Sequence, residues 1–124
     1  MKVLEARDAA YNRIILEKNR DIILEGLEYS DSEDSPKYLN SGLNSIMAKI
    51  ASKNRNILGI RTSKLAILPK RRKAIILARI GQNIRICKKA NAGIAIDLEK
   101  REERSSLIES LGGSTKQSSQ AISF

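Results

Sequence analysis

Histidine and tryptophan are absent from the 124-residue sequence, which contains only one cysteine, one phenylalanine and three tyrosines. The lack of histidine excludes Ser-His and Cys-His nucleophile pairs, HExxH zinc sites and imidazole acid–base catalysis. Cys87 alone forms neither an internal disulfide nor a thiolate metal cluster, and its helical surroundings predict a small buried side chain. No G-x-G-x-x-G or G-x-x-x-x-G-K-[ST] loop is present. Most familiar hydrolases and nucleotide-dependent enzymes are therefore disfavoured.

Long hydrophobic runs are also lacking. The sequence has no apolar run of about 18 residues or more and no secretory signal pattern, so no transmembrane helix is predicted. Its 41% hydrophobic and 30% charged residues are typical of a globular chain. At this length we expect one domain, residues 1–124, in a cytoplasmic protein without a membrane partner.

Acidic residues are missing from the middle of the chain. Residues 49–90 contain thirteen lysines or arginines and no aspartate or glutamate, whereas residues 1–34 contain nine acids and five bases. A solubilising surface normally mixes both signs, so this asymmetry indicates a polyanion-binding face, with nucleic acid as the expected class. Because aromatic side chains are scarce, we expect contacts to phosphates and to the shape of folded RNA or duplex.

The densest basic segment is LPKRRK, residues 68–73, which places four cations at the start of a predicted helix. Cations repel the positive end of the helix dipole, and a bound phosphate would relieve that repulsion while accepting from free N–H groups. From charge and position we predict ten RNA-binding residues: Arg13, Arg61, Lys64, Lys70, Arg71, Arg72, Lys73, Arg79, Lys88 and Lys89.

Hydrophobic periodicity predicts an alternation of short strands and helices. Strands are expected at residues 2–6, 21–24, 56–60 and 93–98. Helices are expected at residues 8–19, 41–53 and from 70 to about 91, followed by one that ends at Leu111 and a short one at about 114–123. A polar loop at about 26–40 and a helical turn at 61–69, stopped by Pro69, complete the prediction.

Two of these helices carry patterns that bear on binding. Ser41 is the expected N-cap of helix 41–53, whose apolar stripe consists of Leu43, Ile46, Met47, Ile50 and Ala51. In the long helix the 3, 4, 3 spacing predicts a buried seam of Leu77, Ile80, Ile84 and Cys87. Its outer face is then cationic, with Arg79, Arg85, Lys88 and Lys89.

Four strand–helix alternations predict an α/β fold with a parallel sheet and right-handed crossovers. We expect a parallel (βα)4 half-barrel that resembles the C-terminal half of a TIM barrel, with a small doubly wound parallel sheet as the alternative. A half-barrel leaves sheet edges open, so it needs a partner, a second copy or unusual capping.

Several short motifs resemble the archaeal and eukaryotic ribonuclease P protein component 3, a TIM-barrel-like subunit family. The most recognisable is residues 41–51, SGLNSIMAKIA, although Ser45 stands where the family usually has histidine. The resemblance covers almost the whole chain but only the C-terminal half to two-thirds of a typical member, so it describes a form that lacks the N-terminal part. The remaining matches are Asn12-Arg13, residues 21–24, residues 83–85 with Lys88-Lys89, residues 93–96, Leu107, Leu111-Gly112, and residues 121–123.

This resemblance implies a supporting role in the 5′ maturation of precursor tRNA. In that enzyme the RNA subunit and its bound Mg²⁺ carry the chemistry, so no catalytic residue and no protein-bound cofactor or metal is expected here. The implied partners are ribonuclease P RNA, precursor tRNA and ribonuclease P protein component 2. A second copy, or a separate chain that supplies the N-terminal half, is also considered. We expect helix 41–53 and the open sheet edge to contact protein, with Leu43, Ile46, Met47 and Lys49 as candidates.

Two alternatives belong to other functional classes. One is a self-dimerising half-barrel hydrolase that holds Mg²⁺ through carboxylates at strand ends, for which Glu25 with Glu28 and Asp97 with Glu99 are the candidates. The other is a general basic nucleic-acid-binding protein, which would not distinguish structured RNA from duplex DNA.

Overall fold

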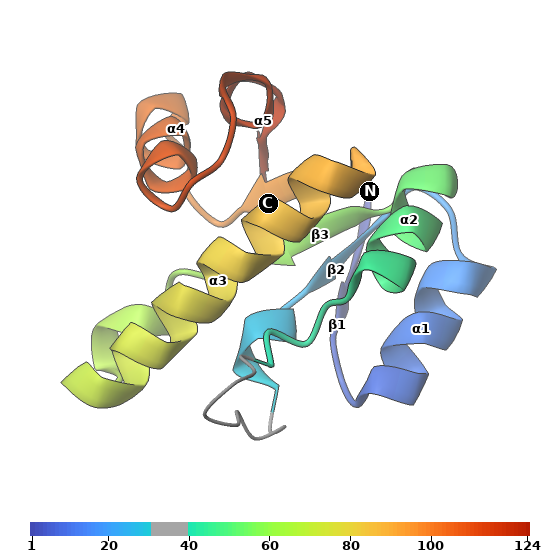
Figure 1. Ribbon diagram of the computed structural model, residues 1–124, viewed down its shortest axis with the longest axis horizontal. Coiled ribbons are helices and arrows are strands. Elements are labelled where there is room, and N and C mark those ends of the chain that lie inside the picture. The colour runs from blue at the N-terminus through green and yellow to red at the C-terminus, as the bar shows by residue number, and fades with distance from the viewer. Residues whose placement is uncertain (31–39) are drawn as a thin grey trace.

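The computed structural model describes residues 1–30 and 40–124 as alternating strands and helices (Figure 1). All four predicted strands are present, within one or two residues of the expected bounds. The elements in chain order are β1 (Lys2–Glu5), α1 (Ala9–Lys18), β2 (Ile22–Glu25), η1 (Leu27–Tyr29), α2 (Ser45–Lys53), β3 (Ile57–Ile60), η2 (Leu65–Ile67), α3 (Lys70–Ala90), β4 (Gly93–Ile96), α4 (Arg101–Ser110), α5 (Thr115–Gln120) and β5 (Ile122–Ser123).

The strands form one five-stranded sheet in which every neighbouring pair is parallel, in the order β1-β2-β3-β4-β5. The predicted α/β fold with a parallel sheet is confirmed. A doubly wound sheet reverses its strand order at a switch point, whereas this order runs in one direction, as in consecutive βα units of a TIM barrel. Right-handed crossovers then place the connecting helices on the same face.

Polar side chains and proline define where the helices begin. Asp8 caps α1, and Asn44 caps α2 by accepting a hydrogen bond from Met47 N–H at 2.8 Å. The prediction of Ser41 as that cap was wrong: Ser41 is buried and its hydroxyl donates to the carbonyl of Leu43. Pro69 directly precedes α3, as predicted, because its fixed φ suits the start of a helix.

The core lies between the sheet and helices α1 to α4. Leu24, Leu58 and Ile96 contribute side chains from the strands. In Figure 1 the long helix α3 crosses in front of the sheet. Cys87 is buried on α3, as predicted, and burial raises the pKa of its thiol to about 12. The predicted seam is shifted, since Leu77 is half-buried and Ile76 is fully buried in its place.

The C-terminal segment differs from the prediction. The short helix expected at about 114–123 ends at Gln120, and residues 122 and 123 form β5 beside β4. In the predicted loop at 26–40, residues 27–29 form η1, and residues 31–39 lie outside the described part of the chain. Among the described helices, none combines the length and the apolar character that a membrane span requires.

Candidate functional site

The exposed face of α3 is the strongest candidate for an interface. Seven residues of this helix are exposed, and they comprise five cations and two alanines: Lys70, Arg71, Ala74, Ala78, Arg85, Lys88 and Lys89. Their spacing places them on one side of the helix, opposite Ile80, Ile84 and Cys87 in the core. No acidic residue occurs anywhere in α3. This set, which we call the α3 basic face, joins four predicted residues and adds Arg85, which the ten predicted residues did not include.

Three more predicted residues lie in the first turn of α3 or in the segment that precedes it. Arg72 and Lys73 are half-buried in its first turn, and exposed Lys64 precedes η2. In the described part of the chain there are three ion pairs, and none of them includes these residues or the α3 basic face. Their charge is therefore not neutralised by a described carboxylate.

Arg79 does not lie on the α3 basic face. It is 2% exposed, and its Nη1 donates to the carbonyl oxygens of Glu28 at 3.2 Å and Ser30 at 2.9 Å. These bonds hold η1 and the residue after it against α3. Burial of a guanidinium is tolerated here because backbone carbonyls replace its lost hydration. In this structure the Arg79 guanidinium therefore has a structural role, and the exposed cations of α3 are the stronger candidates for RNA contact.

Two other predicted cations do not extend the α3 basic face. Arg13 is exposed on α1, where its Nε pairs with Glu17 Oε1 at 2.9 Å, an i,i+4 pair. Arg61 follows β3 and pairs with buried Glu25, with 3.0 Å between Nε and Oε2. The ten predicted residues therefore do not form a single patch, and the helix alone brings most of them together.

Arg61 belongs to a second charged region, the strand-end cluster, formed by Glu25, Glu28, Arg61, Thr62 and Asp97 after the carboxyl ends of β2, β3 and β4. Glu28 accepts from Arg61 N–H at 2.9 Å, and Asp97 accepts from the Thr62 N–H and hydroxyl, both at 2.6 Å. The strands meet here because they are parallel and in register. The sequence indicated all three acids of this cluster as candidates, but it did not reveal their hydrogen-bond partners.

Burial and hydrogen bonding shift the pKa values in this cluster in opposite directions. Burial raises the pKa of Glu28 to about 7, with nearby Glu25 and Asp97 adding to the effect and Arg61 N–H opposing it. Burial also raises the pKa of Asp97, but donation from Thr62 and Ser63 outweighs it and the net pKa is lowered. The hydrogen bond with Glu25 raises the pKa of Arg61, which keeps it charged.

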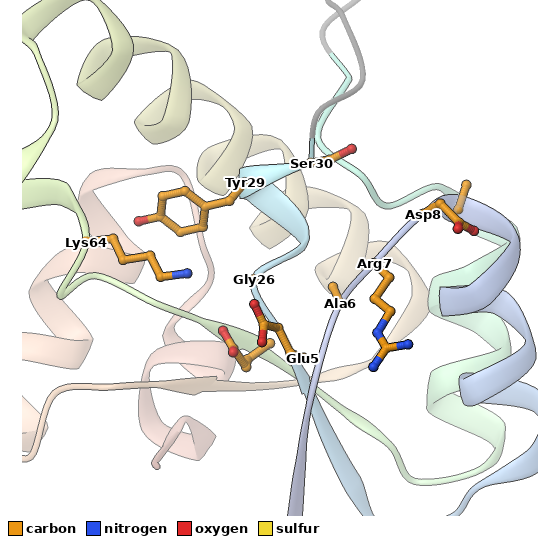
Figure 2. Close-up of a pocket in the computed structure, with 10 residues that line it drawn as sticks. Glu5, Ala6, Arg7, Asp8, Gly26, Tyr29, Ser30 and Lys64 are labelled. Carbon is orange, nitrogen blue, oxygen red and sulfur yellow. The ribbon is translucent and has the colours of Figure 1, made fainter.

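A pocket of about 480 Å³ opens beside this cluster (Figure 2). Figure 2 shows Glu5 and Tyr29 on its walls with Lys64 nearby. Glu25 reaches the pocket because its in-register neighbour on β3 is Gly59, where an added Cβ would lie 2.9 Å from the Glu25 Cβ. Tyr29 is held by donation of its hydroxyl to the Arg61 carbonyl at 2.6 Å. The pocket mixes acids and bases, unlike the uniformly basic α3 face.

The strand-end carboxylates were the candidates for a Mg²⁺ site. Glu25 is already paired with Arg61, and Asp97 is already occupied by three donors from Thr62 and Ser63. Over residues 1–30 and 40–124, no group of three or more acids, cysteines or histidines is arranged to hold a metal ion. The geometry here favours a structural network.

The predicted protein contacts separate into two pairs. Leu43 and Met47 lie in the core, so their side chains are not exposed to a partner in this structure. Ile46 is 56% exposed and Lys49 is also exposed on α2, so both remain predictions. The apolar stripe of α2 is therefore buried in part: Leu43, Met47 and Ala51 lie in the core, whereas Ile46 is exposed.

Residues that carry the family resemblance have structural roles in this fold. Asn12 is buried and closes the turn after β1 by bonding to both the N–H and the carbonyl of Arg7. Asn83 donates to the Ser41 carbonyl at 3.1 Å and so ties α3 to the start of the 41–51 motif. Residues 122 and 123, matched to a closing helix of the family, form a strand. Comparison of the chain with models of known protein families gives no match, and comparison with curated proteins also gives none.

Proposed function

We propose that this protein binds structured RNA through the α3 basic face and the adjoining residues Lys64, Arg72 and Lys73. The observation that carries the proposal is the composition of the exposed residues of α3, five cations and two alanines without an acid. A helix surface kept only for solubility normally includes both signs of charge. A surface with one sign attracts phosphates and gains affinity by releasing their counterions.

Within this class we propose a subunit of ribonuclease P that supports 5′ maturation of precursor tRNA, with ribonuclease P RNA and protein component 2 as partners. The finer proposal rests on the resemblance of residues 41–51, 83–85 and 88–89 to that family. Lys88 and Lys89 belong both to the resemblance and to the α3 basic face. The RNA partner would supply Mg²⁺ and the chemistry.

The hydrolase alternative has less support. It needs Glu25 and Asp97 to accept a metal ion, but Arg61 and Thr62 already donate to these carboxylates. A general DNA-binding protein is the remaining alternative, and charge alone does not separate it from an RNA subunit.

The test is a binding series across salt concentrations with ribonuclease P RNA, an unrelated structured RNA of equal length, and duplex DNA, each with and without component 2. The variant pair Lys70→Gln with Arg71→Gln removes two exposed charges from α3. Its matched control is Lys18→Gln with Arg20→Gln, which removes two exposed charges near the end of α1. We expect the α3 variant to bind RNA about tenfold more weakly at low salt, with the control unchanged.

Preference for the cognate RNA that increases with component 2 would support the subunit proposal. Equal binding to all three nucleic acids would overturn it in favour of a general basic binder. If the α3 variant and its control weaken binding to the same small extent, the α3 basic face is not the interface and the RNA-binding proposal fails.

A further inference from the structure

We infer that the α3 basic face lies along a single double-helical stretch of RNA and contacts its phosphates at both ends of the helix. The inference rests on the proposed function and specifies its ligand. The two contact groups are Lys70 with Arg71 at the start of α3, and Lys88 with Lys89 at its end.

The two groups point to the same side but act independently. Arg71 and Lys89 are 18 residues apart, which is five complete turns and therefore the same face of the helix. At a rise of about 1.5 Å per residue their Cα atoms are about 27 Å apart. The Debye length at physiological salt is about 8 Å, so neither group screens or reinforces the other. One polyanion must reach both places to gain from both.

The C-terminal group is larger than α3 alone suggests. Asn91 accepts from Ser52 Oγ at its carbonyl, at 3.1 Å, and from Lys116 Nζ at its side chain, at 3.0 Å. These bonds bring the ends of α2 and α3 together with the start of α5, so exposed Lys53 and Lys116 join the group.

Lysines at a helix C-terminus often only complement the helix dipole, and that explanation covers part of this group. The ends of α2 and α3 contribute about −0.5 charge each, against four lysines. Lys116 lies in the first turn of α5, where a cation gains nothing from the dipole. A net charge of about +3 therefore remains for a ligand.

The middle of the face favours a duplex over a single strand. Ala74 and Ala78 are the exposed residues between the two groups before Arg85, and their small side chains let a backbone approach closely. The exposed residues of α3 include no aromatic side chain on which splayed bases would stack. Ile80 and Ile84 anchor α3 in the core, so the separation of the groups is fixed. This separation suits a stiff RNA duplex of about ten base pairs or more, because A-form RNA rises less per base pair than B-form DNA.

The experiment uses RNA hairpins with stems of about 4 and about 16 base pairs, a DNA hairpin of the longer length, and a single-stranded RNA of equal charge. The variants are Lys70→Gln with Arg71→Gln, Lys88→Gln with Lys89→Gln, and the control Lys18→Gln with Arg20→Gln. On the long RNA hairpin each α3 variant should reduce the slope of log affinity against log salt by about 1.5. On the short stem, removal of one group should leave binding at the other.

The outcomes separate the inference from the function on which it rests. If only the Lys70→Gln with Arg71→Gln variant weakens binding to the long RNA hairpin, the inference that one duplex contacts both ends of α3 is overturned, and the proposal of RNA binding stands. If both α3 variants weaken binding to the single-stranded RNA as much as binding to the long RNA hairpin, the assignment to duplex RNA is overturned. Equal affinity of the protein for the DNA hairpin and for the long RNA hairpin also overturns it. If both α3 variants match the control on every RNA, the proposed function itself fails.

Discussion

The α3 basic face and the strand-end cluster are both rich in charged side chains, but they differ in whether these side chains have partners within the protein. On α3, five cations face solvent and form no described ion pair. At the strand ends, Glu25, Glu28 and Asp97 each accept from Arg61, Thr62 or Ser63. The cations of the first region are therefore available to a ligand outside the protein, whereas the carboxylates of the second region accept hydrogen bonds from within the fold.

Burial explains why the two regions differ. A buried charge costs several kcal/mol unless hydrogen bonds replace water, so Glu28, at 1% exposed, must find partners. An exposed lysine retains its hydration and needs none. Hydrogen-bond or ion-pair partners within the protein therefore distinguish charged groups with a structural role from those that are free to bind a ligand.

The largest expected effect comes from replacing a buried arginine of α3 by alanine, compared with the same replacement of an exposed arginine of that helix. Arg79→Ala removes two charge-assisted hydrogen bonds to the carbonyls of Glu28 and Ser30, and we expect a loss of about 4 kcal/mol in the free energy of unfolding. Arg71→Ala, at an exposed position, should change it by less than about 0.5 kcal/mol. Urea unfolding measured at pH 7 compares the two.

RNA affinity should respond in the opposite order. Arg71→Ala should weaken binding, and the fraction of Arg79→Ala that remains folded should bind like the unchanged protein. A stable Arg79→Ala variant with weakened RNA binding would show that the guanidinium reaches a ligand after all, contrary to its place in the structure.

The next effect concerns Glu28. Its folded pKa is about 7, above the ordinary value of 4.5, so between these pH values the folded protein binds more protons than the unfolded chain. Stability should therefore decrease as pH rises from about 4 to about 8, by roughly 3 kcal/mol in total, and most steeply between the two pKa values. Glu28→Gln keeps an acceptor for Arg61 N–H but does not ionise, so its stability should lack this decrease.

The measurement is urea unfolding of both proteins at several pH values from 5 to 8. The stability of Glu28→Gln relative to the unchanged protein should rise as the pH increases. If the free energies of unfolding of the two proteins change in parallel over this pH range, Glu28 is not the source of the pH dependence of stability. Glu5→Gln, at an exposed position on the wall of the same pocket, is the control and should leave the profile unchanged.

Periodicity and proline sufficed to predict most of the fold. Short β-branched runs gave the first four strands, and Pro69 gave the start of α3, because these signals act locally. The strand β5 was missed, since two residues next to a polar helix give no pattern, and only pairing with β4 makes them a strand. The N-cap of α2 was placed three residues early because Ser41 and Asn44 are both good caps.

The site was predictable by composition but not by position. The acid-free segment pointed to α3, but Arg79 lies within the buried spacing of Ile76, Ile80 and Ile84, and its charge was taken as a sign of exposure. No sequence pattern reveals that the carbonyls of Glu28 in η1 and of Ser30 just after it accept from this side chain, across 51 and 49 residues. The partners of Glu28 and Asp97 were hidden for the same reason, since each joins segments more than 30 residues apart.

The smallest expected effect tests whether Asp97 belongs to the structural region. Asp97→Asn replaces one acceptor oxygen by a donor, which would face the N–H of either Thr62 or Ser63, so we expect a loss of about 2 kcal/mol in the free energy of unfolding at pH 7. Because the folded pKa is lowered, the carboxylate stabilises the fold above pH 4 and this advantage is lost as pH falls through the folded pKa. The difference in stability between the two proteins should thus narrow in acid.

The RNA affinity of Asp97→Asn at pH 7 should not change, in contrast to that of Lys70→Gln with Arg71→Gln. If Asp97→Asn instead kept full stability and abolished a Mg²⁺-dependent activity, the strand ends would be the functional region and the hydrolase alternative would replace the RNA-binding proposal.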